Sequence, residues 1–269
     1  MGSSSHLESF HKQYEDIDSN RLLPSRILFV IIDALRLDFM TLHHNHANTS
    51  SSYNKLTTIH DMLLHNSSQC ALFGFRADPP TTTSQRLRAI VTGGLPTFVD
   101  IGSNFNTGQV NEDSLLHKWR ESKKRIVMLG DDTWTHLFDA DMFTASHPFE
   151  SFTTRDIHSV DNGILDALPH YLDDCSANKR TPSFEPSCWS KGPLPPECRG
   201  EACQWDILIT HFLGVDHVGH TYTAHHPLMG DKLQAMNEVI KRVVSFLPDG
   251  VLLVVMGDHG MTDAGEHGT

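Results

Sequence analysis

The sequence has no run of apolar residues long enough to cross a membrane. A membrane-spanning helix needs about 18 or more apolar residues in succession, whereas the most apolar stretch, residues 26–35, has the length of a strand and is interrupted by Asp33. No signal peptide is visible at the start. We therefore expect any membrane anchor or secretory leader to lie outside these 269 residues.

Basic residues are scarce relative to acidic ones, with 21 Lys and Arg against 33 Asp and Glu and a net charge of −12. Proteins that bind nucleic acid present a basic face to the phosphate backbone, so we expect no nucleic-acid partner. An acidic chain suits cation binding, but it also improves solubility, and charge alone favours neither interpretation. The apolar content of 39% is sufficient for a buried core.

Cysteines in the spacing CxxC are also absent, which argues against a zinc knuckle. Four of the five cysteines lie close together, at Cys175, Cys188, Cys198 and Cys203. Their surroundings are rich in Pro, Gly and Ser, so we interpret residues 175–203 as an inserted loop. We favour disulfides formed in an oxidising compartment, with buried or free thiols as the alternative. Glycosylation sequons at Asn48 and Asn66 favour the same compartment, although such tripeptides are frequent by chance.

The first 24 residues are polar, and their start, MGSSSH, resembles the remnant of an expression tag. We expect this segment to be flexible and exclude it from the fold. Residues 25–269 are then predicted to form one domain with the insert at 175–203.

Four apolar runs that end in Gly or Asp predict strands at residues 26–33, 125–132, 205–216 and 251–258. Continuous apolar runs, as opposed to alternating ones, are typical of strands buried on both faces. Apolar residues at helical spacing predict an amphipathic helix over 228–247, and a second helix is expected over 112–124. This alternation predicts an α/β fold, with a mostly parallel central sheet and helices on both of its faces.

Carboxylates follow three of the predicted strands, at Asp33, Asp216 and Asp258. One Asp after a strand is commonly a turn or helix cap, but the carboxyl ends of parallel strands meet at one edge, where ligands bind. Histidines stand beside these carboxylates, at His220, His259 and His267. Since zinc accepts His nitrogen and carboxylate oxygen, the pattern predicts a dinuclear metal centre.

A threonine-rich turn at residues 78–94, DPPTTTSQRLRAIVTGG, offers a nucleophile. A Thr at the N-terminus of a helix would place its hydroxyl near backbone N–H groups that favour anions. The alternative is structural, because Thr and Ser are good N-caps. A two-metal site with such a nucleophile suits phosphoryl transfer.

Further motifs occur along the chain: IDALR, PPTTTSQR, TGGLPTFVDIGSNF, GDDTW, VDNGIL, HFLGVDHVGHTY, HHPLM and GDHGMTDAGEHG. Over residues 25–269 they resemble the GPI ethanolamine phosphate transferases, within the alkaline phosphatase and nucleotide pyrophosphatase superfamily. The resemblance is greatest to the group that modifies the third mannose. It implies an alkaline-phosphatase-like fold.

The resemblance also implies roles for single residues. One zinc ion would be held by Asp33, Asp258 and His259, with Thr83 as the nucleophile that touches it, although Thr81 and Thr82 stand in the same turn. The second zinc ion would be held by Asp216, His220 and His267. Asn104 would help to hold the phosphate.

The implied reaction transfers phosphoethanolamine from phosphatidylethanolamine to a mannose of the GPI glycolipid precursor, through a threonine-linked intermediate. It would take place on the lumenal side of the endoplasmic reticulum membrane, with a small membrane partner subunit in the full-length protein. Family members carry a membrane helix before this domain and many after it, so the chain is interpreted as a C-terminally truncated catalytic domain. The alternatives are a soluble metal-dependent phosphodiesterase or phosphatase, and an inactive truncated isoform.

Overall fold

The computed structural model describes residues 24–42, 50–95, 108–172 and 204–267. The strands are β1 (Arg26–Ile32), β2 (Ile126–Asp131), β3 (Ala145–Phe149), β4 (Ile207–Phe212) and β5 (Val251–Met256). The helices are α2 (Leu37–Met40), α3 (Thr57–His65), α4 (Thr83–Thr92), α5 (Leu115–Glu121), α6 (Thr133–Leu137), the 3-10 helix η2 (Ala140–Met142), α7 (Ser159–Ala167), α8 (Pro169–Leu172), α9 (Gly214–Tyr222) and α10 (Pro227–Phe246).

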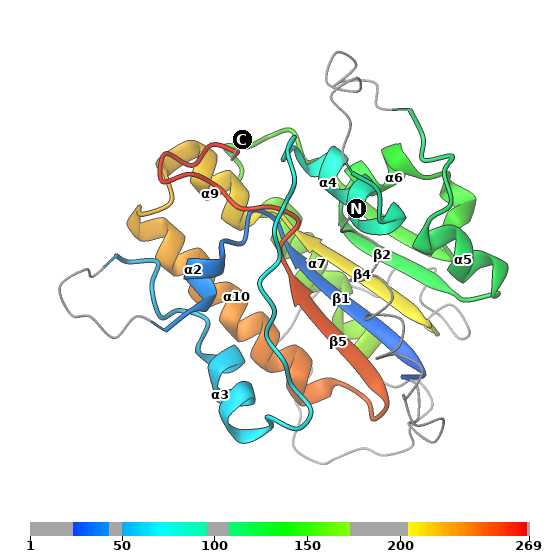
Figure 1. The fold of residues 1–269 in the computed structure, drawn as a ribbon, viewed down its shortest axis with the longest axis horizontal. Helices are drawn as coiled ribbons and strands as arrows, with labels where there is room; N and C mark the ends of the chain where they lie inside the picture. The colour runs from blue at the N-terminus through cyan, green and yellow to red at the C-terminus, as the bar shows by residue number, and fades with distance from the viewer. Residues whose placement is uncertain (1–23, 43–49, 96–107, 173–203, 268–269) are drawn as a thin grey trace, which may run out of the picture.

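The five strands form one sheet in the order β3-β2-β4-β1-β5, and every pair of neighbours is parallel. Parallel strands need crossover connections, which the helices between them supply. All strands therefore end at the same edge of the sheet, where the chain segments after β1, β4 and β5 meet (Figure 1). The predicted parallel α/β fold is confirmed.

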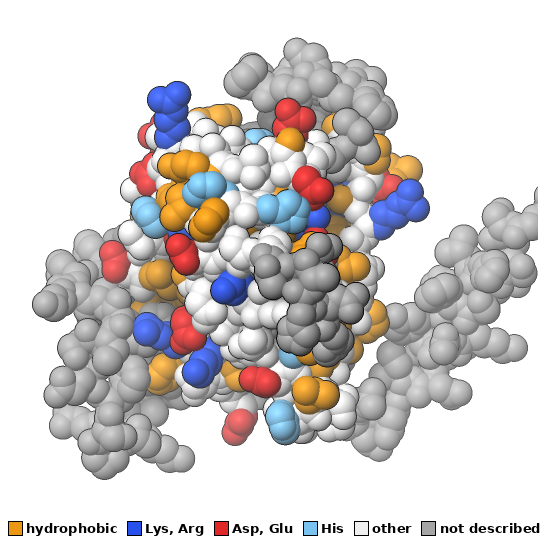
Figure 2. All heavy atoms as spheres, turned by 90° about the vertical axis from the view of Figure 1, so that its left-hand side faces the viewer, with side chains coloured by type: hydrophobic (Ala, Val, Ile, Leu, Met, Phe, Trp, Pro, Cys, Tyr) orange, Lys and Arg blue, Asp and Glu red, His pale blue; other side chains and the backbone are white. Residues whose placement is uncertain are grey.

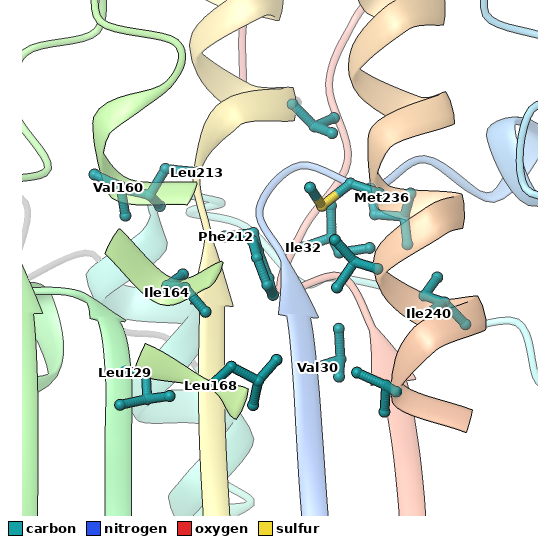
Figure 3. Packing of buried hydrophobic residues seen from close by; sticks show 14 of the residues in the cluster. Val30, Ile32, Leu129, Val160, Ile164, Leu168, Phe212, Leu213, Met236 and Ile240 are labelled. Carbon is teal, nitrogen blue, oxygen red and sulfur yellow. The ribbon is translucent and has the colours of Figure 1, made fainter. Parts of the chain in front are cut away.

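Two layers of helices cover the sheet, because side chains along a strand alternate between its faces. Leu28, Val30 and Ile32 of β1 join a core shared with α7, α8, α9 and α10. Ile31 of β1 instead joins a second core shared with α4, α5 and α6. Figure 3 shows the first core, in which Met236 of α10 lies beside Ile32 of β1. The prediction of helices on both faces is confirmed.

Two of the expected strands differ from the prediction. The strand expected over 205–216 ends at Phe212, and the chain enters α9 two residues later, so two elements share this apolar run. The strand expected over 251–258 forms β5, but none of its residues is fully buried, because it lies at the edge of the sheet. Strand β3 was not expected, since ASHPF is short and contains a proline.

The predicted helix over 228–247 is α10, whose apolar stripe includes Leu233, Met236 and Val243 in the core. No helix among the described residues is both long and apolar enough to cross a membrane.

In Figure 2, acidic and basic side chains are interspersed on the face that lies on the left-hand side of Figure 1. The described residues visible on that face therefore form no large area of a single charge.

A buried ion pair joins α7 to α10 and to the start of α9. The Lys232 ammonium lies 3.1 Å from Asp161 Oδ2, and both side chains are buried. Asp161 Oδ1 accepts hydrogen bonds from the backbone N–H groups of Leu213 and Gly214 at 3.0 and 3.1 Å. A carboxylate at this position also complements the positive end of the α9 dipole.

Replacing Lys232 with Met should lower the free energy of unfolding by about 3–5 kcal/mol, because Asp161 is left buried without its counter-ion. The measurement is urea unfolding followed by circular dichroism. The matched control is Lys118→Met, since the exposed Lys118 pairs with Asp113 and Glu121 at the surface. The control should leave the unfolding midpoint nearly unchanged, and equal midpoints for both variants would contradict the prediction.

Candidate metal centre

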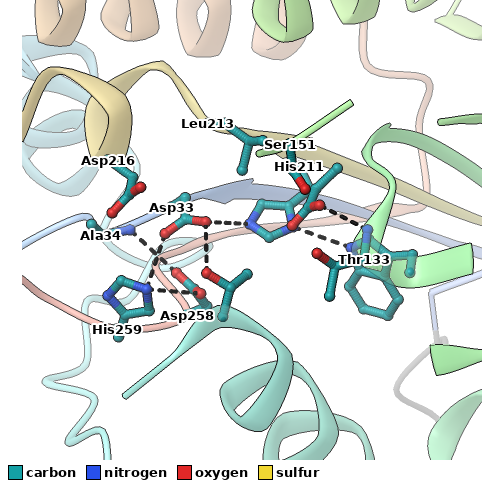
Figure 4. A network of polar contacts seen from close by, with 12 residues as sticks. Asp33, Ala34, Thr133, Ser151, His211, Leu213, Asp216, Asp258 and His259 are labelled. Carbon is teal, nitrogen blue, oxygen red and sulfur yellow. Dashed lines mark hydrogen bonds and ion pairs between the residues drawn. The ribbon is translucent and has the colours of Figure 1, made fainter. Parts of the chain in front are cut away.

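Acidic side chains gather where the chain leaves the sheet. Asp33 directly follows β1, and Asp258 follows β5 after one intervening glycine. Asp216 does not end a strand as expected, but lies in the first turn of α9, beyond the end of β4. The prediction that these three carboxylates meet at one edge is correct for their side chains, as Figure 4 shows.

The backbone fixes the position of the first two carboxylates. The N–H of Asp33 donates to the carbonyl of Phe212 at 2.9 Å, which extends the β1–β4 pairing by one residue. Ala34 then turns the chain with a positive φ of 56°, and its N–H donates to Asp258 Oδ1 at 3.2 Å. Gly257 permits this approach, because a Cβ there would lie 2.9 Å from the Leu35 carbonyl oxygen.

Helix α9 places Asp216 and His220 on one face, since residues four apart in a helix are neighbours. His220 Nε2 lies 3.4 Å from Asp216 Oδ1. The capping of α9 by Asp161 holds the first turn, and with it Asp216, against the sheet.

A turn over residues 262–266 brings His267 back to the site. Its hydrogen bonds run from Thr262 N–H to the Glu266 carbonyl, at 2.8 Å, and from Gly265 N–H to the Thr262 carbonyl, at 2.9 Å. Gly265, with a φ of +83°, packs against the backbone of Gly219 in α9, and a Cβ there would lie 1.9 Å from the Gly219 oxygen. This contact brings His267 beside His220, with ring centroids 4.9 Å apart.

Asp33, Asp258 and His259 form the first group of side chains. His259 Nε2 lies 3.1 Å from Asp33 Oδ1 and 3.4 Å from Asp258 Oδ2. These three atoms are buried, and none has a hydrogen-bond partner among the described residues. His259 Nδ1 contacts the Gly260 carbonyl oxygen at 2.8 Å, so this nitrogen carries the ring hydrogen and Nε2 faces the carboxylates.

Asp216, His220 and His267 form the second group. His267 Nε2 lies 3.5 Å from Asp216 Oδ1, which is itself buried without a hydrogen-bond partner among the described residues. The two groups adjoin each other, because the rings of His259 and His267 have centroids 4.3 Å apart. By distance alone, His259 groups with Asp216 and His267, and His211 groups with Asp33 and Asp258, with one donor atom of each residue within 4.8 Å of the others in its group.

The buried negative charges of the site favour the binding of a cation. Burial raises the pKa of Asp33 well above its usual value, and the charges of Asp258 and Asp216 raise it further. Burial lowers the pKa of His259, but the charges of Asp258 and Asp33 outweigh this effect and raise it to about 10. Crowded carboxylates with unpartnered oxygens are stabilised by a positive charge among them, and the oxygen and nitrogen donors present fit a divalent metal ion.

Thr83 of the threonine-rich turn contacts this centre. It is the first residue of α4, and its Oγ1 donates a hydrogen bond to Asp33 Oδ2 at 3.2 Å. Thr82 occupies the N-cap position without capping through its side chain. The hydroxyl of Thr83 therefore lies at the positive end of α4 and beside the crowded carboxylates.

Other predicted features fall outside the described residues. These are Asn104, the sequon at Asn48, the four clustered cysteines, the insert at 175–203 and the N-terminal segment 1–23. Asn66, the second sequon residue, is exposed at the end of α3. Cys70 has no disulfide partner among the described residues.

Sequence reasoning missed several residues that surround the centre. His211 of β4 lies between Asp33 and Asp131, and Trp134 contacts it. Arg86 of α4 donates from Nε to the Asp258 carbonyl at 3.2 Å. An ionisable residue inside the apolar run 205–216 was the available signal for His211.

A protein-family model matches most of this sequence. The model is described as type I phosphodiesterase / nucleotide pyrophosphatase, and it matches residues 63–268. That range contains Thr83 and all the predicted metal ligands except Asp33.

Curated relatives agree with the resemblance drawn from the motifs. The catalytic subunit of GPI ethanolamine phosphate transferase 3 from Homo sapiens is 41% identical over 91% of this chain and 20% of its own length. GPI ethanolamine phosphate transferase 3 from Schizosaccharomyces pombe is 42% identical over 90% of this chain and 23% of its own length. GPI ethanolamine phosphate transferase 2 from Saccharomyces cerevisiae is 32% identical over 94% and 28%, respectively. The chain thus spans only a fifth to just over a quarter of these relatives, and it belongs to the type I phosphodiesterase / nucleotide pyrophosphatase family.

Proposed function

We propose that this chain is the catalytic domain of a GPI ethanolamine phosphate transferase that acts on the third mannose. The observation that carries the proposal is the convergence of two Asp and His groups beside the hydroxyl of Thr83. The relatives named for this activity support the choice of substrates. Phosphatidylethanolamine is the donor, and a mannose of the GPI glycolipid precursor is the acceptor.

Two zinc ions would be held by the residues that the resemblance indicates. Asp33, Asp258 and His259 supply the unpartnered donor atoms of the first position. Asp216, His220 and His267 line the second position. When bound, such ions supply positive charge that stabilises the nonbridging phosphate oxygens and favours the alkoxide form of the nucleophile.

In the first step, Thr83 Oγ1 attacks the phosphorus of phosphatidylethanolamine. A phosphorus–oxygen bond to Thr83 forms, the bond to diacylglycerol breaks, and the diacylglycerol oxygen takes up a proton. Asp33 Oδ2 accepts the hydrogen bond from Thr83 Oγ1, so it holds the hydroxyl proton and orients the oxygen. The N-terminal end of α4 adds a favourable field for the phosphate.

In the second step, the 6-hydroxyl of mannose attacks the same phosphorus. A bond from the mannose oxygen to phosphorus forms while the bond to Thr83 Oγ1 breaks. The proton lost by the mannose hydroxyl restores the threonine hydroxyl, and phosphoethanolamine is left on the sugar. Covalent catalysis thus divides one difficult displacement into two easier ones. The turn at 262–266 and helix α9 border the site, so their exposed side chains would be the first candidates to contact the acceptor.

We infer that the reaction takes place on the lumenal side of the endoplasmic reticulum membrane. The names of the relatives support a place in GPI-anchor biosynthesis. The exposed sequon at Asn66 is consistent with glycosylation in that compartment. A small membrane partner subunit would belong to the full-length protein.

Transfer is tested with detergent-solubilised phosphatidylethanolamine labelled in its ethanolamine, and a GPI glycan as the acceptor. We expect mass spectrometry to find the labelled phosphoethanolamine on the glycan. Release of free phosphoethanolamine with or without the glycan would show that water is the acceptor, and the chain would then be a phosphodiesterase. Absence of both products would contradict the proposal that this chain is catalytic.

Replacing Thr83 with Ala should remove the labelled enzyme intermediate and lower kcat/KM at least about 10³-fold, because the nucleophile is lost. The measurement is mass spectrometry of the peptide that contains residues 81–83, together with initial rates. Thr83→Ser should keep the label, since it keeps a hydroxyl. The matched control is Thr82→Ala, and loss of the label in that variant instead of in Thr83→Ala would contradict the assignment.

Elemental analysis of protein dialysed against zinc should find about two ions per chain. His267→Ala should lower this number to about one, because the second position loses a ligand while the first keeps all three of its own. The matched control is His65→Ala, which removes an exposed histidine of α3 that lies outside the site. An unchanged zinc content in His267→Ala would contradict the ligand assignment.

A further inference from the structure

His211 is an ionisable residue in the middle of the sheet. It lies on β4, pairs with Ile31 of β1 and Gly130 of β2, and is fully buried. Its position on the strand places it on the same face as Ile207 and Ile209, within the core shared with α4, α5 and α6. A histidine in such surroundings needs partners for both ring nitrogens.

Trp134 determines which ring nitrogen carries the hydrogen. The indole Nε1 of Trp134 donates a hydrogen bond to His211 Nδ1 at 3.2 Å. An indole N–H can only donate, so Nδ1 must accept and the hydrogen of the neutral ring is on Nε2. Asp131 Oδ2 lies 3.5 Å from the same Nδ1 without a hydrogen-bond partner among the described residues.

The Nε2–H of His211 is directed at the candidate metal centre. Its distance to Asp33 Oδ2 is 3.6 Å, and it has no hydrogen-bond partner among the described residues. The same Asp33 oxygen accepts the hydrogen bond from Thr83 Oγ1. Figure 4 shows Asp33 between His211 on one side and His259 on the other.

The two oxygens of Asp33 therefore face different partners. Oδ2 faces His211 and Thr83, whereas Oδ1 is unpartnered and faces His259. A carboxylate that rotates freely about its terminal bond would exchange these two oxygens. A donor fixed in the sheet 3.6 Å behind Oδ2 would disfavour this rotation, as the outer partners of metal-binding carboxylates commonly do.

We propose that His211 is a positioning residue, which holds Asp33 through its Nε2–H while Trp134 fixes the ring tautomer. The inference rests on the proposed function, because it assumes that Asp33 Oδ1 binds one of the metal ions. His211 acts on the ion and on Thr83 only through Asp33. Metal affinity is thus the direct measure of its role.

The test measures the dissociation constant for Zn²⁺ of the 269-residue chain by competition with a chromophoric chelator. His211→Leu should raise the dissociation constant of the tighter site about 10–100-fold. His211→Gln should stay within a few-fold of the original, because the glutamine amide can place an N–H where Nε2 was. Trp134→Phe, which removes only the indole donor from this contact, should weaken binding less than His211→Leu.

The matched control is His147→Leu. His147 is a histidine of β3 in the same sheet, and its Nε2 contacts the Tyr171 hydroxyl at 2.8 Å, away from Asp33. This variant should lower the melting temperature of the metal-free chain without changing the Zn²⁺ affinity. Equal losses of affinity in His147→Leu and His211→Leu would overturn the proposal, because general destabilisation would then explain both.

Asp33→Asn separates a failure of this inference from a failure of the proposed function. If Asp33→Asn binds Zn²⁺ as tightly as the unchanged chain, the metal centre itself is wrongly assigned. If Asp33→Asn loses binding while His211→Leu does not, only the positioning role is overturned. The visible spectrum of the Co²⁺-loaded chain distinguishes direct ligation. Loss of a nitrogen ligand in both His211→Leu and His211→Gln would make His211 a ligand and overturn the proposal.

Discussion

The mutual repulsion of buried carboxylates is the constraint on which the rest of this site depends. Asp33, Asp216 and Asp258 are all buried at one edge of the sheet, and burial and repulsion together raise the pKa of Asp33. Such an arrangement is unfavourable unless hydrogen bonds or cations offset it. The backbone N–H of Ala34 satisfies one oxygen of Asp258, while the oxygens that face the centre have no hydrogen-bond partner among the described residues. The fold thus holds the carboxylates in place through backbone contacts, and the oxygens that face the centre remain available to bind a cation.

The sequence was sufficient to predict the architecture because strands buried on both faces have a simple signature. The runs that became β1, β2 and β4 are nearly continuous in apolar residues, and helices cover both faces of these strands. The same signature wrongly predicted that β5 is buried on both faces. Its position at the edge depends on the order of the strands in the sheet, which the apolar pattern does not reveal. The apolar signature also extended the predicted strand over 205–216 too far, because apolar residues continue from the end of β4 into the start of α9. Periodicity alone does not separate a short strand from the first turn of a buried helix.

The candidate ligands were predictable for a related reason. A parallel sheet brings the ends of its strands together, so an Asp after each of two strands must lie at the same edge as its counterpart. His220 was expected because it closely follows Asp216 in the sequence, and the structure adds the reason, since residues four apart in helix α9 are neighbours. His211 was not predictable in this way, because its contacts depend on the order of three strands and on a tryptophan that follows β2. The choice of Thr83 among three threonines similarly depended on resemblance, whereas the structure provides a hydrogen bond to Asp33 that supports it.

The donors of the site come from parts of the fold that are held in place by different contacts. Asp33 follows β1, and His211 of the neighbouring central strand β4 has its Nε2 3.6 Å from Asp33 Oδ2. Asp216 and His220 belong to a helix whose start is capped by a buried ion pair. His267 depends instead on a turn that contacts α9 through two glycines. An ion bound between these segments would connect the turn to the sheet, so its binding energy would also stabilise the turn. The proposed second metal position would therefore be coupled to local order in a way that the proposed first position, beside the strand ends, would not be.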